Sequence, residues 1–359
     1  MKFLIIGLGA AGQRHARNLR ELFGDRIDLC AYRQRRTGGA LTDSLAVEPD
    51  VTPEQKHGIE VFRDLDAALV AAPDAVIVAN PSSQHLATAR RAAEAGCALF
   101  VEKPVSHSWD GVPDLAAYVA RRRLVTFVGY QWRFHPLLAR VKGLLDGGTL
   151  GRVVAANAVY GEYMPAWHPY EDYRQTYAAR SELGGGVLLT QIHDMDYLGW
   201  LIGWPDQVFS LGGHLSNLEI DVEDTASTLM RCGVQGRPIP VHLHQDYLQR
   251  PPSRRCDILL EGGKACFDLL NGSLEVFDAG GASVVREDTA TFRRNDMFLS
   301  EMRHFLACLE GTQKSRVSFA EGCKSLAVAL AARKSLLSGH VEAVEYLQTE
   351  ESRDKLPES

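Results

Sequence analysis

The sequence predicts an α/β fold in which a doubly wound parallel sheet is followed by a second α/β domain with a large, mostly antiparallel sheet. Three observations predict this fold. A glycine-rich turn directly follows the first apolar run, short β-branched runs alternate with alanine-rich stretches up to about residue 130, and longer alternating segments with Gly-rich turns come after them. We expect two domains and a polar tail, at residues 1–128, 129–345 and 346–359.

The first domain is expected to hold a parallel sheet, because buried apolar strands separated by helices are typical of βαβ units. The strands are predicted at residues 2–6, 27–32, 59–62, 75–78, 98–101 and 125–128. The helices between them are predicted at residues 11–22, 64–71, 84–95 and 109–121.

The second domain is expected to begin with a helix and continue with strands of alternating apolar and polar residues, which is the pattern of a half-buried antiparallel sheet. These strands are predicted at residues 153–160, 207–213, 225–231, 239–245 and 256–261. The helices are predicted at residues 136–145, 296–309 and 319–337.

Composition excludes several functional classes. A net charge of −6 argues against nonspecific nucleic-acid binding. The apolar opening at residues 3–12 is too short and too rich in glycine for a membrane span, and it lacks a signal-peptide cleavage pattern. The seven scattered cysteines form no Cys-x-x-Cys pair, so we expect reduced thiols and no metal site. We therefore expect a cytoplasmic enzyme of small molecules, without nucleic-acid or membrane partners.

The glycine-rich turn has the pattern Gly-x-Gly-x-x-Gly and opens a helix. Its residues are Gly7, Leu8, Gly9, Ala10, Ala11 and Gly12. In a Rossmann domain, the three glycines allow the tight turn, the approach of a pyrophosphate and the packing of helix on strand. The helix N-terminus then favours the negative charge of the phosphates. The motif predicts a nicotinamide dinucleotide.

The residues after the second strand distinguish the two forms of this dinucleotide. An Asp or Glu about 20 residues past the glycines would bind the ribose 2′-hydroxyl of NAD. Here the stretch is Ala31-Tyr32-Arg33-Gln34-Arg35-Arg36, without a carboxylate. Arg33 and Arg36 could pair with a 2′-phosphate, and Tyr32 or Arg33 could stack near the adenine. We expect NADP rather than NAD; the alternative is a solvated basic loop. The polar insertion 35–57 is expected to be a loop near the cofactor.

Two further motifs resemble those of a known family. Val101-Glu102-Lys103-Pro104 ends the fifth predicted strand, and Gly129-Tyr130-Gln131-Trp132-Arg133-Phe134 follows about 30 residues later. With the glycine turn, they make the chain similar to the Gfo/Idh/MocA oxidoreductases, which include glucose–fructose oxidoreductase and inositol dehydrogenase. The resemblance extends to about residue 340.

The resemblance implies a Rossmann domain followed by a domain whose open sheet mediates homodimers or homotetramers. It places Asn80, Pro81, His85 and Gln131 along the cofactor. It also implies that Glu102 contacts the nicotinamide ribose, that Lys103 reaches the reacting hydroxyl, and that the Lys103–Pro104 bond is cis.

A fourth motif runs from Gly184 to Asp196, where the family has a glycine run, an Asp, a His and a second Asp three residues beyond it. His193 and Asp196 match the last two positions. The upstream Asp is missing, and Thr190 stands about where it would be, so the family's Lys–Asp–His relay is incomplete. Thr190 can bind a substrate hydroxyl, but it cannot act as a base at neutral pH.

These residues predict the oxidation of a secondary alcohol, in which hydride moves to nicotinamide while the protein manages the hydroxyl proton. We assign His193 as acid–base group, because its ordinary pKa suits proton exchange. Lys103 is assigned to orient and polarise the hydroxyl, since a lysine beside a cationic nicotinamide has a lowered pKa.

The aromatic and polar segment 160–174 is expected to bind a carbohydrate-like substrate, with Trp167 and Tyr173 as candidates; the alternative is an ordered loop packed on the sheet. Arg133 could bind a carboxylate or phosphate, or could be a structural ion-pair partner. The expected substrate is a sugar, inositol or sugar nucleotide. The alternatives are an NAD-dependent glycoside hydrolase that uses transient oxidation and elimination, and a non-catalytic cofactor-binding sensor.

Overall fold

The N-terminal part of the chain forms a parallel six-stranded sheet in this computed structural model, which describes residues 1–34, 39–168, 170–234, 237–289 and 291–348. The strands are β1 (Lys2–Ile6), β2 (Asp28–Tyr32), β5 (Ile59–Phe62), β6 (Ala75–Val78), β7 (Ala98–Val101) and β8 (Thr126–Val128). Their order is β5-β2-β1-β6-β7-β8, and every pair is parallel. The predicted doubly wound sheet is confirmed.

Five helices accompany this sheet, at α1 (Ala10–Phe23), α2 (Pro53–His57), α3 (Leu65–Val70), α4 (His85–Glu94) and α5 (Val112–Arg121). The strand order reverses between β1 and β6, and ligands of such sheets bind at the carboxyl ends of the strands on either side of that reversal. The sequence therefore places the glycine turn after β1 and Asn80 after β6 on one ligand-binding crevice.

The insertion expected as a loop is partly folded, which corrects the prediction for residues 35–57. It contains a two-stranded sheet of β3 (Ala40–Leu41) and β4 (Val47–Glu48), followed by α2. The helix begins with a capping box, in which the Thr52 hydroxyl accepts from the Gln55 amide and the Gln55 side chain accepts from the Thr52 amide. Pro53 stands at its first position, where the missing N–H costs nothing.

The second sheet has nine strands in the order β16-β15-β14-β13-β9-β12-β11-β10-β17. Only the pair of β9 and β12 is parallel among these described strands, so the predicted mostly antiparallel sheet is confirmed. The strands are β9 (Val153–Gly161), β10 (Pro205–Gly213), β11 (Thr225–Val234), β12 (Arg237–Asp246), β13 (Ser253–Leu260), β14 (Gly263–Asp268), β15 (Ser273–Asp278), β16 (Ser283–Asp288) and β17 (Glu342–Ala343).

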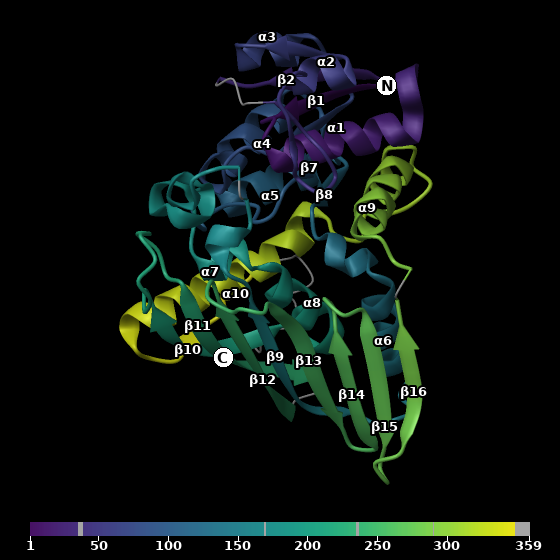
Figure 1. The fold of residues 1–359 in the computed structure, drawn as a ribbon, viewed down its shortest axis with the longest axis vertical. Coiled ribbons are helices and arrows are strands. Elements are labelled where there is room, and N and C mark those ends of the chain that lie inside the picture. The colour runs from purple at the N-terminus through teal and green to yellow at the C-terminus, as the bar shows by residue number, and fades with distance from the viewer. Residues whose placement is uncertain (35–38, 169, 235–236, 290, 349–359) are drawn as a thin grey trace.

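The remaining helices lie largely between the two sheets, as Figure 1 shows. They are α6 (Pro136–Gly147), α7 (Val187–Thr190), α8 (His193–Ile202), α9 (Arg294–Leu309) and α10 (Phe319–Ser338). Helix α10 contacts both β10 and β8, and α9 packs on α1. The C-terminal helices thus join the two sheets, while the domain limits at residues 128 and 345 stay a prediction. Among the described residues, no helix is long and apolar enough to cross a bilayer.

Candidate active site

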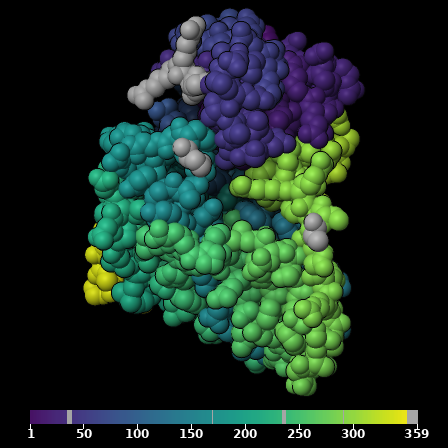
Figure 2. All heavy atoms as spheres, in the orientation of Figure 1, coloured from purple at the N-terminus to yellow at the C-terminus, as the bar shows by residue number. Residues whose placement is uncertain are grey.

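A cleft of about 1040 Å³ lies between the two sheets and takes residues from both parts of the chain. Figure 2 shows the molecule hollowed where the purple and blue N-terminal domain meets the teal segment and the yellow-green start of α9. Its lining includes the glycine turn, the loop after β6, residues 102 and 103, and residues from segments 160–168 and 170–178. The motifs found in the sequence therefore come together at one site.

The glycine turn has the backbone that a dinucleotide needs. Gly7 has φ +94°, and a Cβ on it would lie 2.7 Å from the Ala79 carbonyl oxygen. A Cβ on Gly12 would lie 1.9 Å from the Gly7 oxygen, whereas nothing lies within 4 Å of that position on Gly9. The open space at Gly9 faces the start of α1, and Leu8, Ala10 and Ala11 also line the cleft. The turn therefore fits a pyrophosphate.

The end of the cleft beside β2 holds Tyr32, Arg33 and Gln34. The buried Arg33 guanidinium forms an ion pair with Glu54 of α2, a residue that the sequence analysis did not single out. Arg36 lies outside the described residues. The cleft thus has a basic residue, and no carboxylate, directly after β2.

The loop after β6 and the strand end of β7 form the floor of the cleft. His85 has both ring nitrogens 2.7 Å from backbone oxygens, Nδ1 from Pro104 and Nε2 from Asn80. The Lys103–Pro104 bond is cis, as expected. The Glu102 carboxylate is held 2.7 Å from His15 Nε2, which comes from α1. His15 was missed in the sequence, although it stands three residues after the last glycine of the turn.

Lys103 extends into the cleft from the end of β7. Its ammonium group donates to the Thr190 backbone oxygen at 2.8 Å. Burial lowers the pKa of Lys103 to about 8; the charge of Glu102 opposes that shift, and Arg254 adds to it. An amine with this pKa exchanges protons close to neutral pH.

His193 is the first residue of α8 and is buried beside Lys103 and Gln131. Its Nε2 atom lies 3.3 Å from the Gln131 amide nitrogen, and its ring meets Tyr130 edge to face at 5.7 Å. Among the described residues, Nδ1 has no hydrogen-bond partner. Burial, with the positive charges of Lys103 and Arg254, holds the pKa of His193 well below its ordinary value. The imidazole is therefore neutral at neutral pH.

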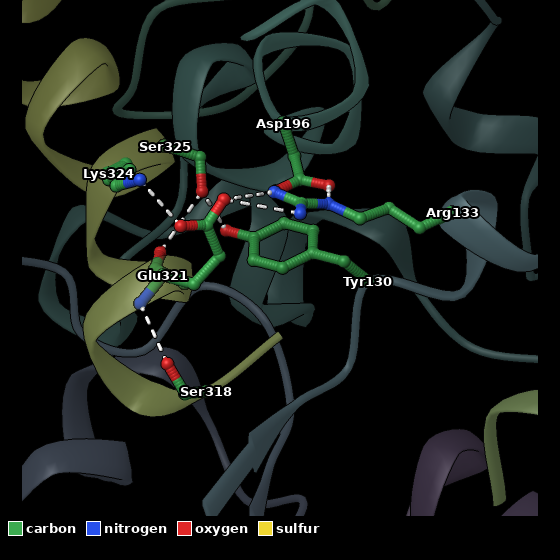
Figure 3. Close-up of polar contacts among 8 residues, drawn as sticks. Tyr130, Arg133, Asp196, Ser318, Glu321, Lys324 and Ser325 are labelled. Carbon is green, nitrogen blue, oxygen red and sulfur yellow. Dashed lines mark hydrogen bonds and ion pairs between the residues drawn. The ribbon is translucent and has the colours of Figure 1, made fainter. Parts of the chain in front are cut away.

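Arg133 is not among the residues that line the cleft. Of the two roles left open for it, the contacts match the structural ion-pair partner and not the substrate ligand. Figure 3 shows its guanidinium between Asp196 and Glu321. It donates to both Asp196 oxygens, at 2.8 and 2.7 Å, and to Glu321 at 3.2 Å. The sequence could not show that Asp196, one turn along α8, and Glu321 of α10 would take up this charge. These ion pairs hold α10 against α8, the helix that begins at His193.

Comparisons with known proteins agree with this arrangement. The family model described as an oxidoreductase family with an NAD-binding Rossmann fold matches residues 1–130, and the model of the same family's C-terminal domain matches residues 138–266. The chain belongs to the Gfo/Idh/MocA family. It is a family of NAD-binding oxidoreductases, and both the predicted fold and the predicted enzyme class are confirmed.

Several family relatives match over nearly their whole length. The chain is 24% identical to the UDP-N-acetylglucosamine 3-dehydrogenase of Acidithiobacillus ferrooxidans, over 93% of this chain and 96% of that one. It is 25% identical to the myo-inositol 2-dehydrogenase of Thermotoga maritima, over 94% and 96%. Among solved structures, the WlbA dehydrogenase of Bordetella pertussis in complex with NADH and UDP-GlcNAcA shares the fold, with a TM-score of 0.77, 21% identity and coverage of 96% and 99%.

This member of the Gfo/Idh/MocA family carries Thr190 on the cleft, near the place of the family's usual aspartate. The nearby carboxylate of Asp194 is bound by Arg254, whose nitrogens lie 2.6 and 3.2 Å from its oxygens. The Arg254 guanidinium also lies over the rings of Trp132 and Tyr160, at 4.2 and 4.0 Å. Asp194 therefore holds Arg254 in place and is not free to replace the missing aspartate.

A further wall of the cleft comes from segments 160–168 and 170–178, and it includes the predicted Trp167 and Tyr173. Trp167 stacks edge to face on Tyr247 at 5.1 Å, and its indole nitrogen has no partner among the described residues. Within the described part of the chain, no cluster of three His, Cys, Asp or Glu side chains could hold a metal ion. The wall offers aromatic faces and polar groups of the kind that bind sugars.

Proposed function

We propose that this chain is an NAD(P)-dependent dehydrogenase that interconverts a secondary alcohol and a ketone on a sugar, inositol or sugar nucleotide. One observation carries the proposal: Lys103 and His193 line the same cleft as the dinucleotide turn, and the Lys103 charge contributes to the lowered pKa of His193. Relatives of nearly the same length are named as dehydrogenases of a UDP-sugar and of an inositol, which supports this substrate class.

The chemistry divides between the cofactor and this chain. A bound nicotinamide accepts or donates the hydride. The glycine turn and the loop at Asn80, Pro81 and His85 hold the dinucleotide, with Glu102 at the nicotinamide ribose. Lys103, His193 and Thr190 hold the substrate hydroxyl. Because the imidazole is buried and neutral, we place the titrating role on Lys103 and the hydrogen bond to the hydroxyl on His193. This exchanges the two roles that we assigned from the sequence.

An absorbance assay for reduced nicotinamide tests the proposal, with the purified protein, NAD or NADP, and a panel of sugars, inositols and sugar nucleotides. Reduction of the dinucleotide by one of these compounds, or its oxidation by the matching ketone, is the expected result. Release of free sugar without net reduction would instead support the hydrolase. Tight dinucleotide binding with no reaction in either direction would support the sensor.

The rate should depend on pH through Lys103. The neutral amine accepts the hydroxyl proton, and its fraction grows as pH rises, so kcat/KM for alcohol oxidation should rise up to about pH 8 and then level off. Ketone reduction needs the ammonium form and should fall over the same range. In Lys103→Arg the guanidinium keeps its proton, so the kcat/KM of any residual activity should not change with pH over this range. If the kcat/KM of the wild type does not change between pH 6.5 and 9, Lys103 is not the group that exchanges the proton.

We propose NADP as the preferred dinucleotide. The support is the basic stretch after β2 and the place of Arg33 on the cleft. The expected result is tighter binding of NADPH than of NADH, measured by nicotinamide fluorescence. Arg33→Gln should weaken NADPH binding by about tenfold, the order of one charge-assisted hydrogen bond, and leave NADH binding nearly unchanged. Equal or tighter binding of NADH by the wild type would overturn this preference.

We also propose a cytoplasmic homodimer or homotetramer. All seven cysteines are unpaired, which supports a reducing compartment. The outer face of the second sheet supports assembly, because Leu211, Leu229 and Leu259 are exposed on β10, β11 and β13. The molar mass in solution, measured by light scattering, tests the oligomer.

A further inference from the structure

Two arginines face the cleft without an acidic partner. Arg14 extends from α1, and its guanidinium lies 4.2 Å from the centre of the Phe298 ring. Arg294 is the first residue of α9, and both arginines line the cleft. Among the described residues, no carboxylate lies within 4.0 Å of either guanidinium. Their positive charges are therefore available to a ligand.

The other arginines of the cleft differ in this respect, because each has a carboxylate partner. Arg33 pairs with Glu54, Arg91 with Asp66, and Arg254 with Asp194. The charge of each of these three arginines is therefore partly balanced by an acid in the free protein. Arg14 and Arg294 stand out as the pair left uncompensated in the described part of the cleft.

The surroundings of Arg14 make its charge costly in the free protein. Burial, and then repulsion by Arg294, lower the pKa of Arg14 to about 10, so it remains charged at neutral pH. The charge of Glu102 opposes this shift, and that of Glu301 opposes it less, because burial holds the pKa of Glu301 well above its ordinary value; neither carboxylate pairs with Arg14. Arg294 also adds a positive charge to the N-terminus of α9, which the helix dipole already makes positive. A bound anion would relieve each of these repulsions.

The pair lines the same cleft as His168 of the aromatic wall and His193. After burial, the charges of Arg14 and Arg294 are the groups that lower the pKa of His168, which belongs to the aromatic wall. Arg294 also contributes to the lowered pKa of His193. An anion between the arginines would therefore lie within reach of a substrate whose hydroxyl is held by Lys103 and His193.

We propose that the substrate carries an oxyanion, either a phosphate or a carboxylate, and that Arg14 and Arg294 bind it. The inference rests on the proposed function, because it assumes that the cleft holds a substrate beside the dinucleotide. Arginine suits this role, since its planar group can donate two parallel hydrogen bonds to a phosphate or carboxylate. Phe298 keeps the Arg14 guanidinium in place beneath the ligand.

Equilibrium binding to the full chain saturated with reduced dinucleotide tests this inference without requiring turnover. The probes are UDP, N-acetylglucosamine 1-phosphate and glucuronate, compared with the neutral N-acetylglucosamine and myo-inositol. At least one anionic probe should bind at least about tenfold more tightly than the neutral ones at low salt, and lose this advantage at high salt. UDP and the sugar phosphate report a phosphate site, and glucuronate reports a carboxylate site.

Arg14→Gln and Arg294→Gln should each weaken the anionic probe by about tenfold or more, because each removes a charge-assisted contact. Arg293→Gln is the matched control, since Arg293 precedes Arg294, pairs with Asp296 and does not line the cleft. It should bind the probe as the wild type does. All three variants should bind the reduced dinucleotide normally.

Three results would overturn the inference. The anionic probes could bind no better than the neutral ones, the two variants could match Arg293→Gln, or both could lose dinucleotide affinity to the same extent, which would assign the arginines to the cofactor phosphates. The proposed function is judged separately by hydride transfer. Anion binding that depends on both arginines, without any hydride transfer, would confirm the anion site and contradict the proposed dehydrogenase.

Discussion

Lys103→Met should reduce turnover at least about a hundredfold while leaving the affinity for reduced dinucleotide within about twofold of the wild type. Methionine keeps the length and the apolar stem of the side chain, but it has no proton to exchange. The residues that hold the dinucleotide are on the glycine turn and the loop after β6, so they remain in place. Single-turnover rates and fluorescence titrations of the same preparations would measure both effects.

His193→Ala provides a second variant of the same site. It should also reduce turnover strongly, because the hydroxyl loses a fixed hydrogen-bond partner opposite Lys103. Lys142→Met is the matched control for Lys103→Met, since Lys142 pairs with Asp146 on α6 and does not line the cleft. Retained turnover in both Lys103→Met and His193→Ala would exclude this pair as the reacting groups.

Gly12→Ala should weaken dinucleotide binding at least about a hundredfold, which corresponds to about 3 kcal/mol. The added methyl group would lie 1.9 Å from the Gly7 carbonyl oxygen, and that contact is to backbone, which cannot swing away like a side chain. The turn and the start of α1 must separate, so the amide groups that face the pyrophosphate lose their arrangement. Titration with reduced dinucleotide measures the loss.

Gly143→Ala is the matched control for that substitution. Gly143 is an exposed residue within α6, and nothing lies within 4 Å of the position of an added Cβ. Alanine there should leave dinucleotide affinity unchanged and raise the free energy of unfolding by up to about 1 kcal/mol, because it favours the helix. Normal dinucleotide affinity in Gly12→Ala would show that the turn does not form the cradle.

The sequence predicts the first sheet well because its strands are buried on both faces and its helices are amphipathic. All six parallel strands lie at or within one or two residues of the predicted ranges. The insertion 35–57 was predicted poorly, since α2 is only five residues long and depends on the Thr52 capping box rather than on an apolar periodicity. Strands β14, β15 and β16 were missed because their apolar alternation is short and interrupted by turns.

The residues of the site also divide into those that the sequence predicts and those that it does not. Lys103 and His193 stand in motifs that are local in the sequence, so they could be found without the structure. Glu54, His15 and Arg254 act through partners far along the chain, and no spacing in the sequence shows that Arg254 meets Asp194 or that Arg33 meets Glu54. For the same reason the sequence could not decide between the two roles left open for Arg133, because Asp196 is 63 residues away from it and Glu321 is 188.

The packing of α9 on the first domain has a consequence for how the chain is made. Phe305 of α9 meets Phe100 edge to face at 5.5 Å and contacts the tilted ring of Phe127 at 6.1 Å, and the Val128 amide donates to the Val317 oxygen. These partners leave the ribosome long after the strands that they cover. During synthesis, the nascent N-terminal sheet therefore displays an aromatic edge until α9 is made and covers it, and a chain terminated before α9 would present that edge to chaperones and proteases.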